Sequence, residues 1–126
     1  MTPEEVLGRL RSLCSLLPEV KEVDLLGEPA FRVATNTFAA FEVLDDGHAV
    51  TFKLTLDEQA TVVEGERFVE ASERGEHGWT SARIDRTIDW EHLDELVVAS
   101  YRLVAPDWCV ARLDALLAGE PPPAEA

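Results

Sequence analysis

The first residues of the chain carry the pattern of an amphipathic helix. Thr2 and Glu5 have the spacing of a capping box, and Pro3 falls at the first helical position, where proline is favoured. Apolar residues then recur at steps of three and four, at Val6, Leu7, Leu10, Leu13, Cys14 and Leu17. Because proline cannot continue a helix, the pattern predicts one helix that Pro18 ends.

Beyond Pro18 the apolar period shortens toward two, as it does in half-buried strands. Valine, phenylalanine and leucine are concentrated in residues 22–26, 31–34, 38–44 and 49–54. Turn-forming residues at 35–36 and 45–47 separate the later segments, and short turns of this kind join antiparallel neighbours. The pattern predicts an antiparallel meander of three or four strands.

The helical period returns at Thr55, which forms a second capping box with Glu58 ahead of a short helix. The polar residues 70–78 are predicted to form a loop, and residues 79–84 a last strand. Asp89 is placed to cap a long helix. Its apolar stripe consists of Trp90, Leu93, Leu96, Val97, Tyr101 and Val104, which are predicted to lie in the core.

A final helix is predicted to begin at Pro106 and to end before Gly119. The chain of 126 residues is long enough for one hydrophobic core, so residues 1–118 are expected to form a single domain, with 119–126 as a flexible proline-rich tail. The fold class is α+β, with an antiparallel sheet and helices packed on one face.

The net charge of the chain limits the kinds of partner that it is expected to bind. The chain has 25 acidic residues against 11 lysines and arginines, a formal net charge of −14. Such a charge repels polyanions at long range, so binding to nucleic acid or to an anionic membrane is disfavoured. The acidic N-terminus, the lack of a long apolar run and two cysteines without metal-type spacing lead us to expect a cytoplasmic protein with reduced thiols.

The residues that catalysis or cofactor binding would need are not in a suggestive arrangement. Cys14 falls on an apolar stripe, and His48, His77 and His92 are too far apart to place two metal ligands on one helix face. The seven glycines form no phosphate-binding loop. We therefore expect no enzymatic activity, no metal and no cofactor.

Two features remain as candidates for ligand contact. Arg32, Lys53 and Arg83 fall on predicted strands, where they can gather on one sheet face. His77 and Trp79 flank a glycine at the start of the last strand, in a loop that can hold a contact residue or simply pack an aromatic ring. These five residues are the predicted binding residues.

Several short motifs occur in a characteristic order. They are GEPAFRV at 27–33, Phe38-Ala39, Lys53-Leu54, Asp57-Glu58-Gln59, His77-Gly78-Trp79, Asp89-Trp90 with Leu93 and Leu96, and SYRLV at 100–104. Together they resemble the MmcQ/YjbR-like family over residues 1–117. The resemblance implies a frataxin-like α+β fold and DNA binding through two hairpin wings, and it brings no catalytic residues.

The family resemblance and the charge favour different functions. If the hairpins were DNA-binding wings, Asp45 and Asp46 would place two carboxylates at one tip, where phosphates approach. The alternative is an adapter domain that binds a protein or a small ligand without nucleic acid. Both interpretations stay open at the level of the sequence, and neither identifies the partner.

Overall fold

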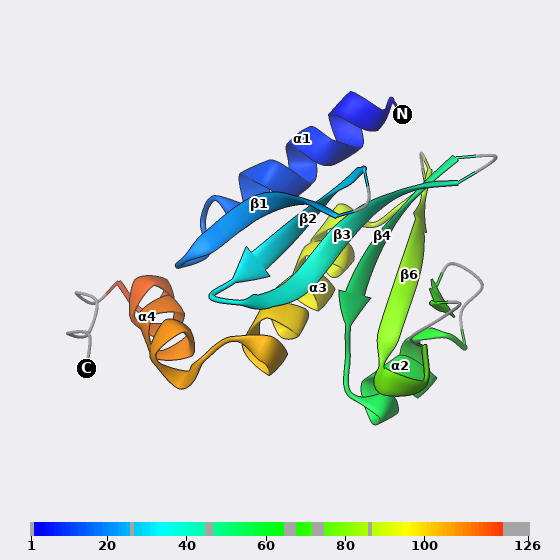
Figure 1. Ribbon diagram of the computed structural model, residues 1–126. Coiled ribbons are helices and arrows are strands. Elements are labelled where there is room, and N and C mark those ends of the chain that lie inside the picture. The colour runs from blue at the N-terminus through cyan, green and yellow to red at the C-terminus, as the bar shows by residue number, and fades with distance from the viewer. Residues whose placement is uncertain are drawn as a thin grey trace.

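The computed structural model describes residues 2–25, 27–44, 47–64, 68–71, 75–85 and 87–119. Its elements are α1 (Pro3–Cys14), β1 (Val20–Leu25), β2 (Glu28–Val33), β3 (Asn36–Leu44), β4 (Gly47–Lys53), α2 (Leu56–Val62), β5 (Phe68–Glu70), the 3-10 helix η1 (Gly75–His77), β6 (Trp79–Ile84), α3 (Trp90–Val104) and α4 (Asp107–Leu117) (Figure 1).

The strands form one six-stranded sheet in the order β1-β2-β3-β4-β6-β5, and every neighbouring pair is antiparallel. Helices α1 and α3 lie behind this sheet in Figure 1, and α4 lies beyond the ends of β1 and β2. The opposite face of the sheet is turned toward the viewer. The predicted α+β class, with an antiparallel sheet and helices on one face, is confirmed.

Side-chain caps fix the starts of the first two helices, as their sequences predict. Thr2 and Glu5 form both hydrogen bonds of a capping box at α1, and Thr55 and Glu58 do the same at α2. Each box satisfies two backbone N–H groups that a helix start otherwise leaves without acceptors. At α3, the Asp89 carboxylate accepts a hydrogen bond from a backbone N–H of the first turn.

The stripe of α3 packs against the middle of the sheet, where β3 and β4 lie. Tyr101 is fully buried, and its ring meets that of Phe38 edge to face with the centroids 5.4 Å apart. Its hydroxyl donates a hydrogen bond of 2.7 Å to the carbonyl oxygen of Pro18. Trp90 is only half-buried, because it begins the helix at the edge of the core, and the guanidinium of Arg9 lies over its ring.

A β-bulge interrupts the pairing of β2 with β3. Phe31 pairs with Ala39 and Arg32 with Thr37, so Phe38 is the additional residue on β3. The bulge turns the Phe38 side chain into the core together with that of its neighbour Ala39, and both residues are fully buried. The alternation of apolar and polar residues therefore breaks at this point of the strand.

The structure differs from the predicted elements in several places; strand β2, for example, begins at Glu28 rather than at residue 31. Helix α1 ends at Cys14, and Leu17 is buried from a turn, because a residue that precedes proline disfavours helical backbone angles. Strand β1 begins at Val20 rather than at residue 22. Within the predicted loop 70–78, Glu70 belongs to the edge strand β5 and residues 75–77 form η1. The predicted turn at Asp45 and Asp46 and most of the predicted tail, from residue 120, lie outside the described residues.

Candidate functional site

The sheet face opposite α1 and α3, which we call the open face, collects most of the predicted binding residues. Its side chains come from alternate positions of the strands, because successive residues of a strand point to opposite faces. The charged residues on it are Lys21, Glu28, Arg32, Glu42, Lys53 and Arg83. The open face therefore carries four bases and two carboxylates. This is a local excess of two positive charges in a chain whose net charge is −14.

Three of these bases share one end of the open face. Lys21 on β1 lies directly opposite Arg32 on β2, and Lys53 on β4 follows the residue that pairs with Ala39. Neighbouring strands are about 4.8 Å apart, so the backbones of Arg32 and Lys53, with β3 between them, are roughly 10 Å apart. We call Lys21, Arg32 and Lys53 the basic row.

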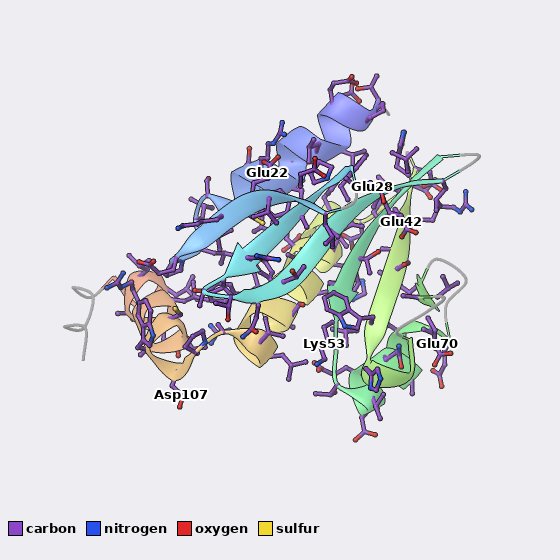
Figure 2. The ribbon with its side chains drawn as sticks, viewed as in Figure 1. Glu22, Glu28, Glu42, Lys53, Glu70 and Asp107 are labelled. Atoms are coloured by element: carbon purple, nitrogen blue, oxygen red, sulfur yellow. The ribbon has the colours of Figure 1, made fainter. Side chains whose placement is uncertain are left out.

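The carboxylates lie at the other end of the open face. Figure 2 shows Glu28 and Glu42 close to each other, far along the sheet from Lys53. The Glu28 carboxylate accepts a hydrogen bond of 2.6 Å from the backbone N–H of Val43, beyond the end of the β2 ladder. Arg83 belongs to this end as well, since it pairs with Ala49, which also pairs with Glu42. The open face is thus polarised along the strands.

Small side chains form the floor between the two ends. Ala30, Ala40, Thr51 and Ser81 lie side by side on β2, β3, β4 and β6. The Thr51 hydroxyl contacts a Glu42 carboxylate oxygen at 3.1 Å and the Ser81 hydroxyl at 3.2 Å. These contacts satisfy the polar side-chain atoms of the floor, and Ala30 and Thr51 are buried.

The bases on the helices differ from those of the basic row in their partners. Arg11 binds Glu22 at 2.7 Å, Arg102 binds Asp114 at 2.7 Å, and Arg112 binds Glu19 at 3.2 Å. Hydrogen bonding to Arg11 also lowers the pKa of the Glu22 carboxyl. Within the described part of the chain, no ion pair involves Lys21, Arg32 or Lys53. The basic row is therefore available to an anionic partner.

Close backbone packing and hydrogen bonds hold the segment His77-Gly78-Trp79 in place. Gly78 has φ +94°, and a Cβ placed on it would lie 2.0 Å from the carbonyl oxygen of Leu54. The buried Gln59 side chain donates hydrogen bonds to the carbonyl oxygens of Gly75 and Trp79, at 2.9 and 3.0 Å. These contacts seat the start of β6 against the end of β4, with Trp79 opposite Lys53.

Four of the five predicted binding residues lie on the open face, namely Arg32, Lys53, Trp79 and Arg83. Trp79 is only 7% exposed, so most of its ring serves packing. His77 lies off the sheet, exposed at the end of η1. Lys21 also lies on the open face, but it falls outside the predicted first strand, which began at residue 22; residues 20–23 are Val-Lys-Glu-Val and do not alternate, so the local pattern holds no signal for it.

The described part of the structure was also compared with what a metal site, a reactive thiol or a membrane-spanning helix requires. No group of three or more His, Cys, Asp or Glu side chains there could hold a metal ion, and both cysteines are buried. Among the described helices, none is both long enough and apolar enough to cross a membrane. The open face presents charged side chains at both of its ends.

Comparison with known proteins places the chain in a family. The family model named YjbR matches residues 16–103. The crystal structure of the Deinococcus radiodurans protein DR2400, a DUF419 domain, has a similar fold, with a TM-score of 0.72 and 21% sequence identity over 99% of this chain and 96% of that one. No curated protein matches the sequence significantly. The YjbR match covers most of the chain, which therefore belongs to the YjbR family.

Proposed function

We propose that this domain is a non-enzymatic binding module whose open face docks an acidic segment of a partner protein. The observation that carries the proposal is the basic row. Acids outnumber bases by more than two to one in this chain, yet Lys21, Arg32 and Lys53 have no ion-pair partner among the described residues. Of the four arginines on the described helices, Arg11, Arg102 and Arg112 are ion-paired, and Arg9 lies over the Trp90 ring.

The form of the face supports a polypeptide as the partner. The basic row extends from β1 across β2 to β4, so a segment that lies across these strands can bring several carboxylates to it. Charge complementarity of this kind speeds association and selects among partners more than it adds affinity. The carboxylates Glu28 and Glu42 at the far end orient the partner, because they repel its acidic part.

Duplex DNA is the alternative that the family resemblance implies, and the four open-face bases favour it. Against it are the two carboxylates on the same face and the net charge of −14, which acts on any polyanion that approaches from a distance. Few contacts to phosphate are available, and such contacts supply most non-specific affinity. An acidic peptide needs fewer of them.

The test is binding of a fluorescein-labelled peptide of about twelve residues that alternates Glu and Ser, whose acidic side chains repeat at about 7 Å when it is extended. In fluorescence anisotropy, Arg32→Gln/Lys53→Gln should weaken its affinity about tenfold, since two exposed charge pairs are lost. The matched control is Arg9→Gln/Arg102→Gln, which makes the same change of net charge on the helical side.

The control should change the affinity by less than about twofold, because charges far from the contact act only through a screened field. Equal weakening by both double variants would mean that the peptide senses net charge alone, and the open face would lose its role. Thermal unfolding of both variants checks that the folded state is retained.

A further inference from the structure

A second surface lies on the opposite side of the molecule, along the solvent-facing side of α3. Here the structure has a shallow groove of about 410 Å³ lined by Glu91, Asp94, Glu95, Val98, Ala99 and Arg102. These positions are spaced by three and four residues, so they form one stripe of the helix. The stripe is opposite the buried one that packs on the sheet, which includes Leu93, Val97 and Ser100.

The groove has an apolar floor and an acidic rim. Val98 and Ala99 are half-buried and form the floor, whereas Glu91 and Glu95 are exposed. No ion pair within the described residues involves either glutamate. Partial burial raises the pKa of the Asp94 carboxyl, and the nearby Arg9 opposes this shift.

The single base in the groove is already engaged. The Arg102 guanidinium contacts the Asp114 carboxylate of α4 at 2.7 Å, so it does not neutralise the glutamates. An occupant must therefore bring positive charge to the rim and a small apolar surface to the floor. Both properties occur together on one side of a basic amphipathic helix.

We propose that this groove is a docking site for a basic amphipathic helix of a partner protein. Helices pack with their axes about 8 to 10 Å apart when the side chains at the contact are small, and Ala99 provides such a point. Lysines or arginines at the edges of the apolar stripe then reach Glu91 and Glu95, which is the helix-in-groove mode of recognition. A second copy of the chain is a poor occupant, because it brings a further net charge of −14.

The probe is a fluorescein-labelled peptide of leucine and lysine, about eighteen residues long so that it can hold a helix, with its leucines on one side. A peptide of the same composition in scrambled order has no apolar side and serves as the control for net charge. The amphipathic peptide should bind the full chain at least about tenfold more tightly than the scrambled one, because only it can cover the floor.

Two substitutions locate the site. Ala99→Gln fills the floor without changing the charge and should weaken binding of the amphipathic peptide about tenfold, whereas Ala60→Gln, at an exposed position of α2, should leave it unchanged. Glu91→Gln/Glu95→Gln removes the rim charges and should also weaken binding about tenfold. Its matched control is Asp57→Asn/Glu70→Gln, which removes two exposed carboxylates elsewhere.

The proposal fails if the scrambled peptide binds as well as the amphipathic one, or if each variant and its control have equal effects. It also fails if light scattering shows that the chain alone forms a dimer that Ala99→Gln dissociates, since a second copy then occupies the groove. The open-face peptide assay uses different residues and a probe of opposite charge, so the two proposals can fail separately.

Discussion

The hydroxyl of Ser100 donates a hydrogen bond of 2.6 Å to the carbonyl oxygen of Phe38, the additional residue of the β3 bulge. The same hydroxyl accepts a hydrogen bond of 2.8 Å from the backbone N–H of Lys53 on β4. One side chain of α3 thereby joins β3 to β4 at the end of their ladder. It also fixes the backbone of a basic-row residue from the opposite side of the sheet.

Ser100→Ala should lower the free energy of unfolding by about 1 to 3 kcal/mol, because it leaves a buried N–H and a buried carbonyl without their partner. Urea unfolding measures this change, and amide hydrogen exchange should show faster exchange at Lys53. Ser12→Ala, at an exposed position of α1, is the control and should have little effect. Equal stability of the two variants would show that the bridge is dispensable.

Gly78→Ala should be among the most destabilising substitutions of a small residue in this chain. Its φ of +94° and the contact of a new Cβ with the carbonyl oxygen of Leu54 at 2.0 Å require the end of β4 to move. We expect a loss of more than about 3 kcal/mol, as strain and a backbone clash add.

Gly8→Ala provides the contrast within the same chain. A Cβ at Gly8 has nothing within 4 Å, and the residue lies inside α1, so alanine should stabilise the protein by about 0.5 to 1 kcal/mol. Thermal unfolding compares the two variants. A tolerated Gly78→Ala would refute the close approach of β4 to the start of β6.

Alkaline pH should destabilise the fold through the thiol of Cys14. Burial raises its pKa to about 12, and the nearby Glu22 and Asp94 add to the effect. The unfolded thiol ionises near 8.5, so the folded state alone holds the proton between these values. The stabilisation is complete below pH 8.5 and is lost progressively as the pH rises toward 12, by at most about 1.4 kcal/mol per pH unit.

Urea unfolding at a series of pH values between about 8 and 9 measures this slope before ionisation of the unfolded tyrosine, near pH 10, contributes strongly. Cys14→Ala should unfold at lower urea throughout, because it leaves a cavity, but its free energy should depend less on pH over this range. Parallel curves for the two proteins would show that the Cys14 thiol is not the group responsible.

Duplex DNA should bind no more tightly than about 10⁻⁴ M at physiological salt, the weak end of non-specific association. The physical reason is the net charge of −14 and the small number of bases on the open face. Fluorescence anisotropy with a labelled duplex measures the affinity. Each phosphate contact should add about 0.9 to the slope of log affinity against log salt, so a weak binder has a shallow slope.

Tight binding of duplex DNA would contradict this prediction. Sub-micromolar binding that Arg32→Ala, Lys53→Ala or Arg83→Ala weakens, with a steep salt dependence, would show that the open-face bases outweigh the global charge. The adapter proposal would then fail, and DNA binding would be the function of this face.

The local structure could be predicted from the sequence because it depends on residues close together in the chain. Thr2 and Glu5 form their capping box within one turn of helix, and Thr55 and Glu58 do the same. The period of two after Pro18 likewise predicts strands from neighbouring side chains alone. The edge strand β5, with three residues, was too short to give such a signal.

The composition of the open face could not be predicted from the sequence, because it depends on tertiary structure. The sequence places Arg32, Lys53 and Arg83 on strands, but only register decides that they share a face, and the bulge at Phe38 shifts register between β2 and β3. Trp79 lies on the open face and yet is only 7% exposed, which the local pattern of β6 does not predict. A strand pattern specifies two faces; the helices that cover one of them decide which face, and therefore which charges, remain for a partner.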